Sequence, residues 1–383
     1  MKIGTEPLLT PQFTLLLITT SIIGLSFSTY FLLPKFLAVE LAADAATIGG
    51  LSGVSLLASV ICMPFAGVQI DRHGRRLFIY LGALIFASAS AGFLVIDHVG
   101  PLLWTLRLLQ GLAWPLFYVA LATLATDIAP KARMGQAIGV FGAIMISTNA
   151  LGPALAEWGA RQFGWHVVFG ATVVAAVCAA IITRFLRDQH QPQARGATST
   201  MFELVQRPGL KRVLVVTVMV GLAFSSMFTF YQPWALANGI EQVSTYLVAF
   251  AACAMLVRVS TGGIADRLGR RRVAQATLLL YVAAPLSLVW LPSVGLLLSG
   301  CLLGVSHGMF FPAMNAVAVE LARETERGKA MAAYNAAFNF GFATGSYLFG
   351  YIAIASGYPA IYLISAVICA AAFALLVSSR RDR

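Results

Sequence analysis

The chain has 383 residues, of which 59% are hydrophobic and only 11% are charged, and its mean hydropathy is +0.83. This balance excludes an ordinary water-soluble domain and indicates an integral membrane protein. The net charge of +11 would favour a nucleic-acid partner in a soluble protein, but in a membrane protein the positions of the basic residues matter more than their sum.

Twelve apolar stretches approach the length of roughly 20 residues that an α-helix needs to cross a bilayer. We therefore predict an all-α membrane protein with twelve transmembrane helices. The predicted spans are residues 10–33, 45–69, 77–96, 101–124, 134–157, 165–187, 211–236, 244–264, 272–291, 293–318, 329–352 and 358–379.

The basic residues are distributed unevenly between the loops. If both termini are cytoplasmic, 22 of the 26 Lys and Arg residues face the cytoplasm. Lys35 and Arg161 then lie outside, and Arg107 and Arg258 lie within predicted spans. The positive-inside rule therefore predicts a multi-pass protein of the cell inner membrane with both termini cytoplasmic. Membrane lipids are the expected neighbours of the basic loops.

The sequence repeats itself after about half its length. GLSFST at Gly24–Thr29 matches GLAFSS at Gly221–Ser226, and Gly111 and Gly304 belong to a series of pairs with a constant offset of 193. Two six-helix halves in the same order and orientation are indicated, an arrangement typical of transporters, although an inert bundle could also arise by duplication. The predicted parts are the N-terminal half, 1–187, a cytoplasmic linker, 188–210, and the C-terminal half, 211–383.

A dense charged loop occurs in both halves. GVQIDRHGRR at Gly67–Arg76 follows the second predicted span, and GGIADRLGRR at Gly262–Arg271 follows the eighth. The Asp at the helix end can accept hydrogen bonds from another helix N-terminus, the glycines permit a tight turn and close helix approach, and the Arg forks can bind carboxylates or lipid phosphates. Such a loop can latch helices together in one conformation, whereas a simple positive-inside anchor is the alternative.

The paired loops resemble the signature of the major facilitator superfamily (MFS), and the resemblance extends over essentially the whole chain. It is closest to the drug:proton antiporter, or efflux permease, branch. The resemblance implies that the loops form a conformational switch and not the substrate site. The implied switch residues are Gly67, Asp71, Arg72, Gly74, Arg75, Arg76, Gly262, Asp266, Arg267, Gly269, Arg270 and Arg271. We add Asp127, at the end of the fourth span, and Arg258, for which an interfacial anchor is the alternative.

RLLQG at Arg107–Gly111 resembles the Arg-x-x-x-Gly signature of the fourth helix in proton-linked members. A charge inside a span is costly unless it faces a cavity or a partner, although Arg107 could also extend to the outer interface. LLPKF resembles, through Pro34, the end of the first helix in drug:proton antiporters. The membrane-embedded acid that some cation exporters place in the first helix is absent.

The fifth span matches the export signature Gly-x-x-x-Gly-Pro-x-x-Gly-Gly only in part. Gly152 and Pro153 fit, whereas Thr148, Ala156 and Glu157 stand where the signature has glycine. The direction of transport is therefore less firmly predicted than the fold.

Polar groups inside the spans mark the expected substrate path, because each is costly in hydrocarbon unless it faces a cavity or a neighbouring helix. In the first half they are Tyr30, Arg107, Gln110, Trp114, Tyr118 and Asn149. In the second half they are Tyr231, Gln232, Trp234, His307, Asn315, Tyr334, Asn335 and Asn339. We expect Arg107, Asn149, His307 and Asn339 to matter most, with helix packing as the alternative for each Asn and a structural role as the alternative for His307. Gly152, Pro153 and Glu157 complete the predicted substrate and coupling site.

The 15 carboxylates all lie in loops or near the ends of predicted spans. No acid lies at a span midpoint to carry a proton or to pair with a cationic drug. The titrating groups available for proton coupling are Asp127, Glu157 and His307, of which His307 changes charge nearest neutral pH. Arg107 without a deep acid favours an anionic, zwitterionic or amphipathic substrate over a simple organic cation.

We predict a monomeric secondary transporter that works by alternating access and exports a small hydrophobic or amphipathic compound in exchange for protons. Transport of a sugar or metabolite, or facilitated transport in either direction, is the alternative within the same class. A membrane-embedded lipid-modifying enzyme would need a nucleophile with a base, or an acid pair, and neither pattern is present. A receptor would need a longer soluble segment than Arg187–Arg212. No cofactor motif, metal cluster or nucleic-acid partner is predicted, and the 5 Cys residues have no metal-ligand spacing.

Overall fold

The computed structural model describes residues 8–130, 133–188, 201–261, 269–323 and 326–378. Helices make up nearly all of these residues, and no strand occurs among them. The all-α prediction is confirmed.

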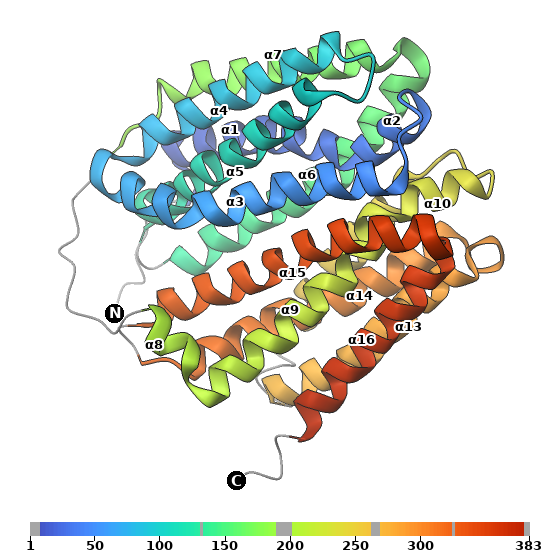
Figure 1. Ribbon diagram of the computed structural model, residues 1–383. Coiled ribbons are helices and arrows are strands. Elements are labelled where there is room, and N and C mark those ends of the chain that lie inside the picture. Colours follow the sequence, from blue (N-terminus) through green and yellow to red (C-terminus); the bar gives the residue numbers. More distant parts are fainter. Residues whose placement is uncertain (1–7, 131–132, 189–200, 262–268, 324–325, 379–383) are drawn as a thin grey trace. The chain divides into compact units, whose positions relative to one another are not determined.

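Within the described residues, a helix overlaps each of the twelve predicted spans (Figure 1). The helices before residue 188 are α1 (Pro11–Thr29), η1 (Tyr30–Leu32), α2 (Leu33–Val39), α3 (Ala45–His73), α4 (Arg75–Gly92), η2 (Phe93–Val95), α5 (Pro101–Ile128), α6 (Met134–Phe163) and α7 (Trp165–Thr183). The later helices are α8 (Met201–Gln206), α9 (Pro208–Thr229), α10 (Tyr231–Ala237), α11 (Ser244–Thr261), α13 (Arg270–Val289), α14 (Leu291–Glu320), α15 (Arg327–Ser356) and α16 (Tyr358–Ser378).

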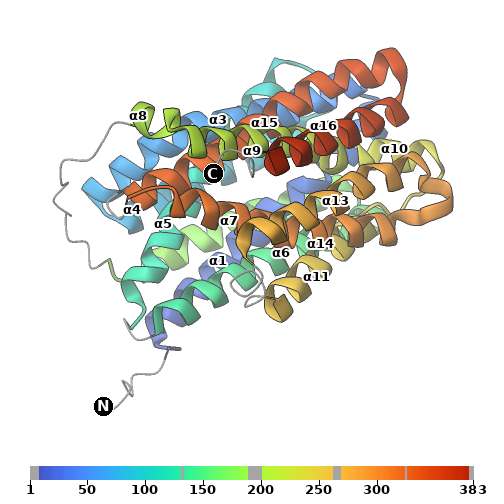
Figure 2. The ribbon, with the colours of Figure 1, turned by 90° about the horizontal axis from the view of Figure 1, so that it is seen from below.

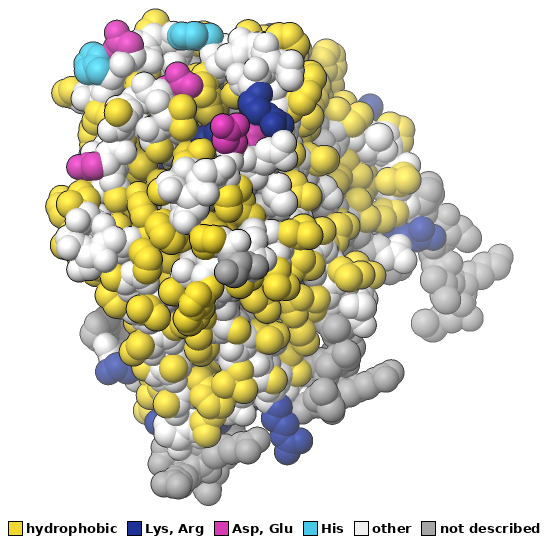
Figure 3. Space-filling view, turned by 90° about the vertical axis from the view of Figure 1, so that its right-hand side faces the viewer, with side chains coloured by type: hydrophobic (Ala, Val, Ile, Leu, Met, Phe, Trp, Pro, Cys, Tyr) yellow, Lys and Arg dark blue, Asp and Glu magenta, His cyan; other side chains and the backbone are white. Residues whose placement is uncertain are grey.

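Within the described residues, 10 candidate spans are long and apolar enough to cross a membrane, and α11 contributes a shorter apolar helix. Hydrophobic side chains cover most of the face drawn in Figure 3, and charged side chains gather toward its ends. Phe65 is 70% exposed and Val259 is 79% exposed. Large apolar side chains are stable at such exposure when lipid surrounds them. The chain is a multi-pass membrane protein.

Contacts divide the chain into two compact units. The first unit contains residues 1–36 and 57–194, and the second contains residues 37–56 and 195–383. Part of the linker predicted at 188–210 lies outside the described residues, and α8 occupies its later part.

The two units pack their helices in the same order. In the first unit α1 packs against α6 and α7, and α4 packs against α5 and α7. In the second unit α9 packs against α15 and α16, and α13 packs against α14 and α16. Figures 1 and 2 both show α9 and α15 side by side. The repeat read from the sequence thus recurs as a repeat of helix packing.

Small residues bring the paired helices close together in both units. In the first unit a Cβ added at Gly24 would lie 2.9 Å from Thr148 Oγ1, and Ser28 Oγ donates to the Thr148 carbonyl at 2.7 Å. In the second unit a Cβ at Gly221 would overlap the Phe338 carbonyl oxygen. Close backbone approach at small residues is a main source of helix association in membranes.

The first part of α3 belongs to the second unit, where it lies against α15. A Cβ added at Gly53 would lie 3.0 Å from the Ala343 carbonyl oxygen, and one at Gly350 would lie 2.7 Å from the Ala45 carbonyl oxygen. Glycine is therefore needed at both positions for this approach.

Replacing Gly221 tests whether this packing limits stability. Gly221→Ala should destabilise the protein by about 1 to 3 kcal/mol, because the new methyl group has no space against α15. Gly142→Ala is the matched control, because a Cβ there meets nothing within 4 Å. We expect the control to change stability by less than about 1 kcal/mol, since Ala favours a helix. Thermal unfolding in detergent measures both, and equal melting temperatures would contradict the packing argument.

Candidate functional site

The first charged loop turns at Gly74, between α3 and α4. Gly74 has φ of 93°, a conformation that L side chains rarely adopt, and its amide donates to the Ile70 carbonyl at 3.0 Å. By contrast, a Cβ added at Gly67 meets nothing within 4 Å. Gly74 therefore fulfils the expected turn, whereas the expected close approach at Gly67 does not occur within the described residues.

Arg75 is the buried centre of this loop. Its side chain is 7% exposed, and its Nε lies 3.0 Å from Asp127 Oδ2 at the end of α5. Its Nη2 lies 3.8 Å from Asp71 Oδ1 in the preceding turn. The structure thus joins three predicted switch residues, and the ion pairs offset the cost of burying the guanidinium.

The N-terminus of α4 receives a carboxylate that the sequence analysis missed. The Arg76 amide donates to Asp188 Oδ2 at 3.0 Å, and the acid suits the positive end of the helix dipole. We expected Asp71 to serve a helix N-terminus, but Asp71 is 58% exposed and pairs with Arg75. Arg72 and Arg76 are exposed.

The second charged loop has the same turn. Gly269, before α13, has φ of 91°, and Arg270 Nη1 lies 2.6 Å from Glu320 Oε1 at the end of α14. The offset of 193 that relates the two halves also relates Asp127 to Glu320, so both halves connect a loop Arg to the end of their fourth helix. Arg271 Nη2 donates to the Leu376 carbonyl at 2.7 Å. Gly262, Asp266 and Arg267, also predicted for the switch, lie outside the described residues.

A further ion pair lies between the start of α9 and the start of α15. Arg207 donates through Nη1 and Nη2 to the two Glu326 oxygens at 2.7 and 2.8 Å. Glu326 is buried, and its hydrogen bonds raise the pKa of the Arg207 guanidinium. Sequence spacing gave no sign of this pair, because 119 residues separate its members.

Arg107 is held by its own helix. Its Nη1 donates to Gln110 Oε1 at 2.7 Å, and Gln110 is fully buried. Tyr30, from η1, is also buried, and its hydroxyl shares a hydrogen bond of 3.3 Å with Thr172 Oγ1 on α7. Arg107 and Gln110 thus form one polar group, whereas Tyr30 joins two helices.

Three aromatic residues of the first unit stack in a row, which we call the first aromatic ladder: Phe27, Trp114 and Tyr118. The ring centroids of Phe27 on α1 and Trp114 on α5 are 3.9 Å apart at an interplanar angle of 25°. Those of Trp114 and Tyr118 are 4.7 Å apart at 14°. All three side chains are partly exposed, so their faces are not fully used in packing.

The second unit carries a matching row, the second aromatic ladder: Phe224, His307 and Phe311. Ring centroids of Phe224 on α9 and His307 on α14 are 4.7 Å apart, and those of His307 and Phe311 are 5.1 Å apart. His307 Nδ1 shares a hydrogen bond of 2.5 Å with the Tyr281 hydroxyl on α13. This hydrogen bond fixes the ring orientation of His307.

The two ladders occupy equivalent positions in the repeat. GLSFST and GLAFSS align Phe27 with Phe224, and the offset of 193 aligns Trp114 with His307 and Tyr118 with Phe311. The middle residues and Tyr118 were predicted from the sequence, whereas the three phenylalanines, Phe27, Phe224 and Phe311, were missed. The internal repeat was the signal that could have found them.

Several other predicted site residues hold helices together. Trp234 Nε1 donates to the Leu288 carbonyl at 2.8 Å, and Tyr231 stacks on Tyr246 with centroids 4.1 Å apart. Asn335 Nδ2 donates to the Met331 carbonyl of its own helix at 2.8 Å. Tyr334 is buried and donates to the carbonyl of Phe311. Gln232 is buried, while Asn149, Asn315 and Asn339 are partly exposed.

Glu157, near the C-terminal end of α6, is buried and forms an ion pair. It is 2% exposed, and its Oε1 lies 2.6 Å from Nζ of Lys35 on α2, which is 12% exposed. The predicted first span ended at residue 33, but α2 continues through Val39, so Lys35 lies on a helix. Gly152 and Pro153 are buried on the same helix as Glu157.

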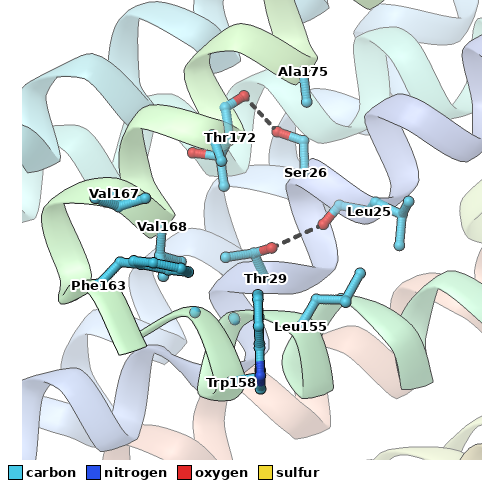
Figure 4. Close-up of a pocket in the computed structure, with 14 residues that line it drawn as sticks. Leu25, Ser26, Thr29, Leu155, Trp158, Phe163, Val167, Val168, Thr172 and Ala175 are labelled. Atoms are coloured by element: carbon cyan, nitrogen blue, oxygen red, sulfur yellow. Dashed lines mark hydrogen bonds between the residues drawn. The ribbon is translucent and has the colours of Figure 1, made fainter. Parts of the chain in front are cut away.

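An apolar cavity of about 340 Å³ lies between α1, α6 and α7 (Figure 4). Leu155, Trp158 and Phe163 line it and are each more than half exposed. Ser26 Oγ donates to the Thr172 carbonyl at 2.9 Å beside it. Neither aromatic ladder contributes to this cavity.

The sequence profile of the Major Facilitator Superfamily matches residues 15–297 and, in a second match, residues 213–383. The chain belongs to the Major Facilitator Superfamily. Multidrug resistance protein MdtG of Dickeya zeae is 28% identical over 347 residues, which are 87% of this chain and 84% of that protein. The multi-drug resistance efflux pump PmrA homolog of Lactococcus lactis is 26% identical over 318 residues, covering 77% of this chain and 76% of that protein.

Solved structures agree with the MFS fold. The nucleoside transporter NupG gives a TM-score of 0.77 at 15% identity, covering 96% of this chain and 99% of that one. The human organic anion transporter MFSD10 gives a TM-score of 0.69 at 17% identity, covering 97% of this chain and 100% of that one. At such identities the likeness concerns the fold alone. The resemblance of the charged loops to the MFS signature is confirmed, and the chain is a transporter of the MFS type.

The two loop ion pairs of this MFS chain offer a matched comparison. Asp127→Asn removes a partner from Arg75, which is 7% exposed, whereas Glu320→Gln removes one from Arg270, which is 36% exposed. We expect Asp127→Asn to destabilise the protein by about 3 kcal/mol and Glu320→Gln by at most about 1 kcal/mol. Thermal unfolding of the two variants measures the difference, and the reverse order would contradict the role of burial.

Proposed function

We propose that this chain is a proton-coupled exporter of small hydrophobic or amphipathic compounds in a bacterial inner membrane, with both termini cytoplasmic. Two relatives carry names of multidrug resistance or efflux proteins, which supports export over uptake. The chain acts as a monomer, because the two halves together provide the transport path of an MFS protein.

The observation that carries the proposal is the pair of aromatic ladders. Each half offers three mostly apolar rings in a row on its first and fourth helices, stacked in the first half and tilted by 38° and 36° in the second. Aromatic faces bind flat apolar groups through burial and offset stacking, without demanding one hydrogen-bond pattern. Compounds of differing outline can therefore bind the same rings.

The charges in the spans favour substrates other than simple cations. Arg107 lies on the same helix as Trp114, seven residues away, and no carboxylate belongs to either ladder. A lipophilic cation would need a nearby carboxylate to offset its charge in hydrocarbon. Neutral, zwitterionic and anionic aromatic compounds are the expected substrates.

Sugar or metabolite transport is less well supported. A sugar site needs several unengaged polar side chains, because each hydroxyl group leaves water on binding. Trp234, Tyr334 and Asn335 already donate to backbone carbonyls.

Transport by the purified protein in liposomes tests the proposal. The compartment that receives the substrate is made acidic relative to the one that loses it. This pH gradient should drive accumulation of chloramphenicol and norfloxacin in the acidic compartment, and protons should move in the opposite direction. A pH-sensitive dye inside the liposomes records the protons, and radiolabel records the substrates. Proton-driven transport of ethidium alone, a simple cation, would contradict the substrate class. Equilibration without proton movement would make the protein a facilitator.

The first aromatic ladder yields a prediction about substrate affinity. Trp114→Ala should raise the KM for chloramphenicol about tenfold, because stacking and apolar burial are lost. Trp104→Ala is the matched control on the same helix, where Trp104 is 37% exposed. The control should keep the KM within about twofold of the unaltered protein. Equal effects of the two substitutions would show that the ladder does not bind substrate.

A further inference from the structure

The ion pair of Lys35 and Glu157 is an unusual feature of the first unit. Among the described carboxylates, Glu157 and Glu326 are buried. Glu326 precedes α15 and serves Arg207, whereas Glu157 lies inside the span Met134–Phe163. Within the described residues, Glu157 is therefore the buried acid of a membrane-crossing helix.

In the second half, the positions equivalent to Glu157 and to helix α2 with its Lys35 carry no charge. The offset of 193 places Gly350 where the first half has Glu157, and α10, which follows α9 as α2 follows α1, has the uncharged sequence YQPWALA. Gly350 is in close contact with the backbone of Ala45. A six-helix half therefore folds without this ion pair, and a requirement of the fold does not explain it.

The pair is arranged so that a proton changes the contact between two helices. With both groups charged, Lys35 and Glu157 neutralise each other at 2.6 Å. A proton on Glu157 removes the negative charge that lies 2.6 Å from the ammonium of Lys35, which raises the free energy of that ammonium at low exposure. Lys35 then extends toward the membrane surface, as long basic side chains do near span ends. The α2–α6 contact is weakened by that step.

The elements that pack against α6 carry the titratable groups Tyr30, Arg107, Tyr118, Asp127, His166 and Cys178. Tyr118 stacks on Trp114, and Cys178 is exposed. The hydroxyl of Tyr30 is hydrogen-bonded to α7, and the guanidinium of Arg107 is bonded within α5. Asp127 lies at the opposite end of α5. His166 on α7 and Arg161 on α6 are exposed. The protonation of Glu157 is thus felt first by Lys35.

Lys35 also has a direct mechanical connection to the first aromatic ladder. It belongs to the continuous span Pro11–Val39, and Phe27, which stacks on Trp114 at 3.9 Å, lies about two helical turns earlier on that span. Release of Lys35 from α6 therefore acts on the same helix that supplies a ring to the ladder.

Resting on the proposed function, we propose that Glu157, paired with Lys35, is the proton-binding site that couples the proton gradient to export. A proton from the predicted outer side binds the Glu157 carboxylate and breaks the ion pair. The proton leaves when the carboxylate opens to the other side and pairs with Lys35 again. One carboxylate carries the proton, and no other chemical change occurs.

Two transport modes in liposomes separate coupling from substrate handling. Proton-driven accumulation of chloramphenicol needs a proton site, whereas exchange of labelled for unlabelled chloramphenicol without a pH gradient needs only substrate binding and alternating access. We expect Glu157→Gln to keep exchange within about twofold of the unaltered protein, to lose its pH dependence, and to reduce accumulation to the level of protein-free liposomes.

A double variant, Lys35→Gln with Glu157→Gly, is the second test, because it copies the uncharged positions of the other half and is expected to fold. It too should exchange chloramphenicol without accumulating it. Accumulation by either variant at the level of the unaltered protein would overturn the assignment of Glu157. If the unaltered protein itself exchanges but never accumulates under a pH gradient, proton coupling in the proposed function is wrong. If it accumulates and the variants do too, only this inference is wrong.

Discussion

Hydrocarbon tolerates a charge only where a partner compensates it or water is within reach, and this constraint determines where the described charges lie. Arg75 is buried against Asp127, Glu326 against Arg207, and Glu157 against Lys35. The pairs Lys35–Glu157 and Arg207–Glu326 connect segments more than 100 residues apart in the sequence, and Arg75–Asp127 connects the neighbouring helices α4 and α5, so the charges also select which helices associate. The interaction energy of such a pair mostly offsets the desolvation of its members. Their value therefore lies in fixing helix contacts that a change of charge can release.

The two halves of the chain share a scaffold and differ in chemistry. Both turn at a glycine with positive φ before an Arg that reaches the end of the fourth helix. Both carry an aromatic ladder, but the middle ring is Trp114 in one and His307 in the other. The duplicated features are those that any rocking pair of halves needs. Differences between the repeats are not explained by the shared scaffold, and Glu157 against Gly350, on which the proposed proton coupling rests, is one of them.

The fold could be predicted from the sequence because hydrophobic length and a repeat are local or periodic signals. Every span was found, and Gly74 was placed at the turn that it makes. The ion pairs of Lys35 and Glu326 and the hydrogen bond that Asp188 accepts could not be found this way, since their partners are 122, 119 and 112 residues distant. Only Glu320 and the phenylalanines of the ladders were within reach of sequence reasoning, through the offset between halves. Tyr30 and Trp234, which the census of polar residues also named, make hydrogen bonds between helices. A census cannot separate such residues from a substrate site, because both roles use the same side chains.

Several polar side chains of the predicted site already make hydrogen bonds within the protein, and this limits how selective the proposed transporter can be. Where Trp234, Tyr334 and Asn335 already donate to carbonyl oxygens, a substrate finds few fixed donors to match, and the rings supply most of the contact. Each aromatic contact adds about 0.5 to 1.5 kcal/mol beyond burial and depends weakly on the outline of the ligand. Discrimination by unpaired polar groups, which separates close analogues strongly, needs dedicated donors and acceptors. The rings of each aromatic ladder, Phe27 with Trp114 in one unit and Phe224 with His307 in the other, therefore suit the proposed binding of a class of compounds and not of one compound.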